Sequence, residues 1–169
     1  MGMIFQNTGA SLCPIRTIED QLYESVLQHE KTSKQEIKER AMDLFEKMKL
    51  SDGERILKSY PFELSGGMNQ RVGIMMAMIL GPSLLFADEP TSALDPETTN
   101  EVIATIQKLV DQKITMLIVT HDMRFAKSSA TRVIFMDEGR IIEENTPEEL
   151  FNHPENTRLQ IFLQSVERS

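Results

Sequence analysis

The stretch Leu84-Leu85-Phe86-Ala87-Asp88-Glu89-Pro90 decides the fold class of this chain. Four apolar residues followed by two acids are typical of a strand that is buried in a parallel sheet and ends where the acids begin. Ligands of open α/β sheets bind at the carboxyl ends of the strands, so Asp88 and Glu89 are expected at a binding edge. One carboxylate can serve Mg²⁺ while the other orients or deprotonates an attacking water. Two solvated acids in a turn are the alternative interpretation.

The segments after this strand alternate as a parallel α/β layer requires. Asp95 is expected to cap, and Pro96 to begin, a helix with an apolar stripe that continues to Val110. A second buried strand is expected at Thr115–Val119. The remaining expected elements are a hairpin of 132–136 with 140–143 and a last helix capped by Thr146. This strand–helix–strand order predicts an α/β fold.

The residues before the deciding stretch are mostly helical. A short apolar run at 1–5 predicts one strand that leads into a polar loop. Ser33 and Glu36 form a capping box, which predicts a helix start at that point. Apolar stripes predict two further helices, at 17–29 and 68–79. We therefore expect a helical insertion ahead of the parallel layer.

Length and composition exclude several protein classes. The 169 residues suit about one domain, and 40% hydrophobic with 26% charged residues exclude collagen-like, fibrous and wholly disordered chains. A net charge of −8 argues against a nucleic-acid grip by the whole domain. The single cysteine, Cys13, fits a reducing compartment. Without an apolar run of about 20 residues or a secretory pattern, a soluble cytoplasmic protein is expected.

Three other motifs carry chemistry suited to a phosphate or a metal. Leu64–Arg71 (LSGGMNQR) presents a serine hydroxyl and two glycine amides at a helix start, which suits a phosphate, although an ordinary N-cap has the same pattern. His121 follows the second expected strand and can bond a terminal phosphate, although a lone histidine is more often structural. Gln6 follows the first strand, where its amide can reach a metal and hold a water. Each of these signals is weak by itself.

Together these motifs resemble the ATP-binding cassette family. Gln6 is similar to the Q-loop glutamine, Leu64–Arg71 to the family signature and Leu84–Glu89 to the Walker B motif. Ser92–Asp95 resembles the D-loop, and His121 resembles the switch histidine. The resemblance implies a phosphate-loop NTPase (RecA-like) core with a parallel sheet and an inserted α-helical signature subdomain.

The resemblance also implies roles for individual residues and a head-to-tail dimer that holds ATP between two cassettes. The implied nucleotide-binding residues are Ser65, Gly66, Gly67, Gln70 and Asp95, of which the first three would contact the γ-phosphate of ATP on the partner and the last would communicate across the dimer. The implied catalytic residues are Glu89 as general base, His121 as γ-phosphate sensor and Gln6. The implied Mg²⁺ residues are Asp88 and Gln6.

The implied domain boundaries follow from the same motifs. Residues 1–6 would end the N-terminal core strand at the Q-loop, and 7–82 would form the helical subdomain with the signature. Residues 83–144 would complete the ATPase core, and 145–169 would form a C-terminal helical extension. Only 57 residues lie between Gln6 and Leu64, too few for the coiled coils that DNA-repair and chromosome ATPases insert there.

The resemblance implies an importer subunit with two open substrate classes. The segment 133–163 looks like polar amino acid importers, whereas 5–14 looks like di- and oligopeptide importers. Implied partners are a second cassette and transmembrane permease subunits, at the cytoplasmic face of the cell membrane, with no nucleic acid.

One family motif is missing from the sequence. None of the eight glycines is followed by lysine, so the phosphate loop G-x-x-x-x-G-K-[ST] is absent and the core is expected to be incomplete at its N-terminus. Weak ATP binding and negligible turnover are therefore expected of this chain alone. Its strand edges are expected to be rearranged, swapped or paired with a partner. An importer ATPase fragment and a non-catalytic module that donates its signature to another cassette are both consistent with the sequence.

Overall fold

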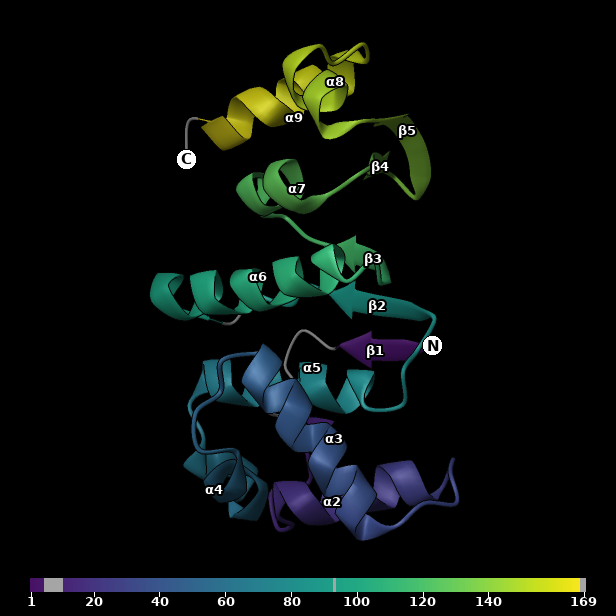
Figure 1. Cartoon of the computed structure of the whole chain (residues 1–169). Coiled ribbons are helices and arrows are strands. Elements are labelled where there is room, and N and C mark those ends of the chain that lie inside the picture. Colours follow the sequence, from purple (N-terminus) through teal and green to yellow (C-terminus); the bar gives the residue numbers. More distant parts are fainter. Residues whose placement is uncertain (5–10, 93, 168–169) are drawn as a thin grey trace. The chain divides into compact units, whose positions relative to one another are not determined.

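The structure is a computed structural model that describes residues 1–4, 11–92 and 94–167. It divides into two compact units, Met1–Val119 and Thr120–Ser169, each described by itself (Figure 1). Unit 1 contains β1 (Gly2–Ile4), α2 (Ile18–Leu27), α3 (Lys34–Lys47), α4 (Gly53–Lys58), a 3-10 turn (Pro61–Glu63), α5 (Gly66–Met78), β2 (Leu84–Asp88), α6 (Pro96–Asp111) and β3 (Thr115–Val119). Unit 2 contains α7 (Met123–Ser129), β4 (Val133–Asp137), β5 (Arg140–Asn145), α8 (Pro147–Asn152) and α9 (Thr157–Glu167).

A three-stranded parallel sheet with the order β1-β2-β3 lies at the centre of unit 1. Its register aligns Ile4 with Ala87 and Ala87 with Ile118. Helices α5 and α6 pack against each other, and α5 also packs against β1. The expected α/β fold with a parallel sheet is thus confirmed, with the deciding stretch as its central strand.

The helical part of unit 1 follows its apolar stripes. In α2 the residues Ile18, Leu22 and Val26 are fully buried, and α2 packs against α3 and α4. The capping box of Ser33 and Glu36 is present as expected at the start of α3. Alternation of buried and charged positions therefore suffices to place these helices.

Strand β3 differs from the expectation of full burial. Leu117 and Val119 lie on the same face of β3 and are 51% and 46% exposed, whereas Met116 and Ile118 on the opposite face are half-buried. An apolar run does not reveal which face of a strand is covered, since both faces carry the same kind of side chain.

Unit 2 is built on the expected hairpin of β4 and β5. Glu138 and Gly139 both have positive φ angles, as a two-residue type I′ loop requires. The seven-residue helix α7, capped by Asp122, was not expected. The C-terminal segment forms two helices instead of one, because the chain breaks around Pro154 between α8 and α9. In the described part of the chain, no helix has both the length and the hydrophobicity to cross a membrane.

The capping box makes stability depend on pH. Bonds from the Ser33 amide, the Thr32 hydroxyl and the Ser33 hydroxyl lower the pKa of Glu36 from its ordinary 4.5 to about 2. A lowered carboxyl pKa stabilises the folded state above pH 4.5 and loses that effect as the pH falls toward 2. Urea unfolding should therefore show the native chain more stable than Glu36→Gln at neutral pH, with a difference that shrinks below pH 4.5. Glu46→Gln on the same helix is the control, and a difference that stayed constant down to pH 3 would contradict the assignment.

Candidate functional site

The two acids of the deciding stretch lie where β2 leaves the sheet. Asp88 is exposed and Glu89 is half-buried. The Glu89 amide donates to the Val119 carbonyl at 2.9 Å, which extends the β2–β3 pairing by one residue. Glu89 has a φ angle of 48°, a left-handed conformation that turns the chain away from the strand. The Ser92 amide and hydroxyl bond the Glu89 carbonyl at 3.2 and 3.1 Å, which stabilises this turn.

The first turn of α5 has the geometry of an anion site. Ser65 is the N-cap, and its hydroxyl oxygen accepts from the Met68 amide at 3.3 Å. Ser65 and Gly66 are exposed, so their polar groups are accessible. A Cβ built on Gly66 would lie 3.4 Å from Leu94, in ordinary contact. Helix N-termini with free amides favour phosphate groups, as the sequence predicted for this segment.

The first turns of α5 and α6 touch at Gly67. A Cβ built on Gly67 would lie 2.2 Å from Cγ2 of Thr98, so only glycine fits there. Asp95 caps α6 by accepting from the amides of Glu97 and Thr98 at 3.1 and 3.0 Å. Hydrogen bonds from the hydroxyl and amide of Thr98 hold the pKa of Asp95 below its ordinary value. The N-termini of α5 and α6 therefore lie close together, with the signature glycines on α5 and Asp95 at the start of α6.

Gly67→Ala should destabilise the chain by about 1–3 kcal/mol, because the new methyl group collides with Thr98 and this outweighs the gain in helix propensity. Gly66→Ala is the matched control and should be close to neutral or slightly stabilising. Thr98→Ser, which removes the opposing methyl group, should restore most of the loss when combined with Gly67→Ala. Chemical denaturation of the four proteins tests this, and equal stabilities of the two alanine variants would refute it.

Arg71 is a residue of this region that sequence reasoning did not assign. Its Nε donates to the Gly67 carbonyl at 3.3 Å, and a terminal nitrogen pairs with Glu101 of α6 at 2.8 Å. The side chain is only 12% exposed. A guanidinium bound at once to the signature turn and to α6 holds the two helices in a fixed relation. The spacing of 30 residues between the two partners gives no local signal for this pair.

Arg71→Met should cost about 1–2 kcal/mol of stability, since the ion pair of this largely buried guanidinium with the half-exposed Glu101 and a bond to the signature turn are lost together. Arg55→Met is the control, because Arg55 pairs with Asp52 at an exposed site, where such pairs contribute little. Thermal unfolding in low and moderate salt measures both. Equal losses in the two variants would show that Arg71 has no special role.

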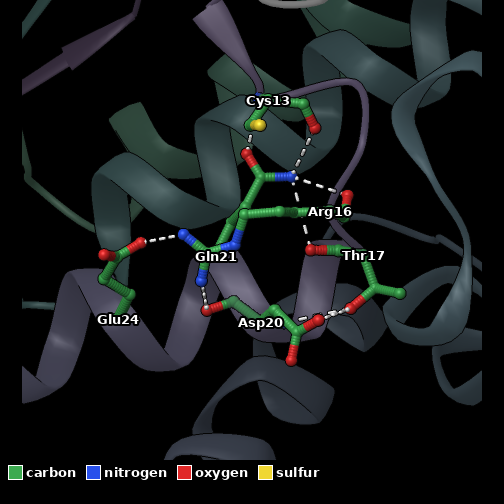
Figure 2. Close-up of polar contacts among 6 residues, drawn as sticks. All are labelled: Cys13, Arg16, Thr17, Asp20, Gln21 and Glu24. Carbon is green, nitrogen blue, oxygen red and sulfur yellow. Dashed lines mark hydrogen bonds and ion pairs between the residues drawn. The ribbon is translucent and has the colours of Figure 1, made fainter.

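A second polar cluster, which the sequence did not reveal, orders the segment that precedes α2 (Figure 2). The Gln21 side chain accepts from the Cys13 amide at 2.7 Å and donates to the carbonyls of Cys13, Arg16 and Thr17 at 3.1, 3.0 and 3.3 Å. Arg16 also forms an ion pair with Glu24. One amide thereby fixes a five-residue segment whose Ile15 side chain is 83% exposed.

The remaining predicted site residues lie elsewhere. Gln70 is 3% exposed, which does not favour direct contact with a ligand, so its predicted binding role stays a prediction. His121 is exposed and belongs to unit 2, just before α7, so the structure does not bring it together with the groups of unit 1. Gln6 lies outside the described residues. The roles carried over to all these residues remain predictions.

The acids at the end of β2 suit a hard divalent cation in their chemistry. Within the described residues, no group of three or more His, Cys, Asp or Glu side chains is placed to hold a metal by itself. Mg²⁺ at phosphate sites commonly takes only one or two carboxylates and completes its shell with phosphate and water oxygens. The exposed Asp88 fits such a shared site.

Comparison with known sequences places these features in context. Residues 1–92 match the family model described as "ABC transporter". The chain is 42% identical over 165 residues to the L-cystine import ATP-binding protein TcyC of Bacillus subtilis, covering 98% of the chain and 65% of that relative. It is 44% identical over 161 residues to the histidine/lysine/arginine/ornithine transport ATP-binding protein HisP of Escherichia coli, covering 95% and 61%. The chain thus spans a little under two thirds of the length of these two relatives.

Solved structures show the same architecture. The ATP-binding cassette MJ0796, in a dimeric post-hydrolysis state bound to ADP and Pi, superposes with a TM-score of 0.71 at 29% identity, covering 86% of this chain and 62% of that one. The cbiO1 protein of Clostridium perfringens, part of the ABC transporter complex cbiONQ, gives 0.78 at 26% identity, covering 98% and 66%. The expected phosphate-loop NTPase fold is thereby confirmed.

Proposed function

The chain belongs to the ABC transporter family, and on that premise we propose that it is the ATP-binding and ATP-hydrolysing part of an importer for amino acids. The names of the relatives, which mention cystine, histidine, lysine, arginine and ornithine, favour amino acids over peptides as the transported class. One observation carries the proposal. Unit 1 contains both the acid Asp88 at the end of β2 and the exposed Ser65 at the start of the signature helix α5.

The acids at the end of β2 would carry the hydrolysis step. Asp88, exposed at the last position of β2, would hold Mg²⁺, which neutralises charge on the phosphates when it is bound. Glu89, turned out of the strand by its left-handed backbone, would accept the proton of the attacking water. Gln6 and His121 would help to position that water and the γ-phosphate.

The signature helix would act on nucleotide held by a partner cassette. Ser65, Gly66 and Gly67 would contact the γ-phosphate through the hydroxyl and the free amides of the first α5 turn. The close contact with Thr98 would transmit changes at that turn to Asp95. A head-to-tail pair of cassettes satisfies this geometry.

The importer assignment also implies permease subunits and a site at the cytoplasmic face of the membrane. The segment held by Gln21 supports a permease contact near residues 6–20, since it presents Ile15 to solvent on a fixed backbone. A rigid exposed apolar residue gives up little conformational entropy when a partner covers it.

A specific observation favours a second candidate function, a signature donor without its own catalysis. Ser65 and Gly66 at the start of α5 are exposed and Gly67 is buried, whereas the sequence contains no glycine followed by lysine and hence no phosphate loop. Such a chain would complete the ATP site of another cassette without binding nucleotide itself.

Mixing experiments separate the two candidates. We expect negligible ATPase activity from the chain alone and a calorimetric dissociation constant for ATP weaker than low micromolar, because the main phosphate anchor is absent. When it is mixed with full-length TcyC, turnover should rise. A loss of that gain in Glu89→Gln would show that this chain's own acids take part in hydrolysis. Glu46→Gln, an exposed acid on α3, is the control.

The result for Ser65 completes the test. If Ser65→Ala lowers the added turnover and Glu89→Gln does not, the chain is a signature donor. If neither variant alters it, the proposal fails. Tight binding of ATP by the chain alone would contradict the expected weak binding and exclude the signature-donor candidate.

A further inference from the structure

The side chain of Asn69, near the start of α5, bonds the turn that precedes the signature. Its Nδ2 donates to the Pro61 carbonyl at 2.9 Å and to the Leu64 carbonyl at 3.3 Å. The Asn69 backbone amide donates to the Ser65 carbonyl at 2.9 Å. One residue therefore holds both ends of the segment 61–64 and the first signature residue after it.

These bonds determine the orientation of the Asn69 side-chain amide. With oxygen and nitrogen exchanged, Oδ1 would face two carbonyl oxygens that it cannot bond. In the orientation observed, Oδ1 is buried and has no hydrogen-bond partner in the part of the chain that the structure describes. An unpaired buried acceptor costs free energy, and asparagine is a weak helix former. Helix stability therefore does not explain an asparagine at this position, whereas the two bonds to the turn do.

The bond to Leu64 fixes the direction of the next amide. The peptide between Leu64 and Ser65 is trans, as are the other peptide bonds of the described residues, so its carbonyl and its N–H point in opposite directions. Because the carbonyl points toward the Asn69 side chain, the Ser65 N–H points away from it. Ser65 is exposed, and no described residue bonds this N–H. The amide is therefore directed and available to a ligand.

The turn that carries Ser65 is also closed by its own hydrogen bonds. The Tyr60 amide donates to the Glu63 carboxylate at 2.8 Å, and two backbone bonds of 3.0 and 3.2 Å close the 3-10 turn. The segment 60–64 is thus a single hydrogen-bonded piece, which the Asn69 side chain attaches to α5. Without that side chain the piece would keep its internal bonds but lose its attachment, and Ser65 at its end would lose its fixed direction.

We propose that Asn69 is the positioning residue of the signature, which holds the amide and hydroxyl of Ser65 in the direction in which they meet a phosphate. The Ser65 hydroxyl accepts from the Met68 amide, so its own hydrogen is available to donate. Donors that are fixed before the phosphate arrives need no reorganisation when it binds. Asn69 itself acts only through Ser65. This inference rests on the proposed function, in which the signature contacts the γ-phosphate of ATP on a partner cassette.

NMR relaxation of the backbone amides, measured on the chain alone, tests the positioning without using activity. The order parameter of the Ser65 amide should be about 0.85 in the native chain and fall below about 0.6 in Asn69→Leu, which has a similar shape but no donor. Ile37→Val shortens a fully buried side chain of α3 and should leave this order parameter unchanged, so it controls for a general loss of stability. Circular dichroism and urea unfolding verify that both variants are folded.

Turnover in the mixture with full-length TcyC tests whether the positioning matters for hydrolysis. At a saturating concentration of the chain, Asn69→Leu should lower the added turnover at least tenfold, because a misdirected donor no longer meets the phosphate. Ile37→Val should leave the added turnover unchanged.

Three results would overturn the proposal. The first is an order parameter of Ser65 that does not change in Asn69→Leu. The second is full added turnover in Asn69→Leu in a mixture where Ser65→Ala removes it. The third is an equal loss of turnover in Ile37→Val. If the order parameter falls but neither Asn69→Leu nor Ser65→Ala alters turnover, the positioning of Ser65 is supported and the proposed function is contradicted.

Discussion

Strand β2 has a hydrogen-bonded neighbour on each side, and this double pairing fixes the groups of unit 1 that carry chemistry. The pairing sets where β2 ends, and therefore where Asp88 and Glu89 emerge. The segment that leaves this end leads directly to Asp95 and α6, whose first turn contacts the signature glycines. The acids at the end of β2 are thus linked to the first turn of α5, which suits a phosphate, through the short loop that leads to α6 and through the contact between α6 and α5.

Local signals predicted most of the secondary structure, because caps and apolar periodicity act over a few residues. The Ser33 capping box and the Asp95-Pro96 helix start are both present as expected. Helix α7 was missed because seven residues are too few to show a period. The exposure of Leu117 could not be read from the sequence, since whether one face of a strand is covered depends on which distant segments pack against it.

The candidate site also contains some residues that local sequence signals predict and others that only the folded structure reveals. The positions of Asp88 and Glu89 follow from a strand and its end, and Ser65 follows from a cap. The bridging role of Arg71 and the multiple bonds of Gln21 depend on backbone groups brought close by folding, and no spacing rule encodes them. The resemblance to cassettes supplied roles that geometry alone does not give, such as that of His121.

Thr98 meets two unrelated demands with one small side chain. Its methyl group fills the space left by the missing Cβ of Gly67, while its hydroxyl bonds the carboxylate of Asp95. Serine would keep the second contact and leave a hole at the first. Valine would keep the shape and lose the hydroxyl bond to Asp95, which would retain its bonds from the amides of residues 97 and 98. Few substitutions of Thr98 would therefore preserve both contacts. In related chains, the residue at position 98 should vary together with the residue at position 67, which faces it.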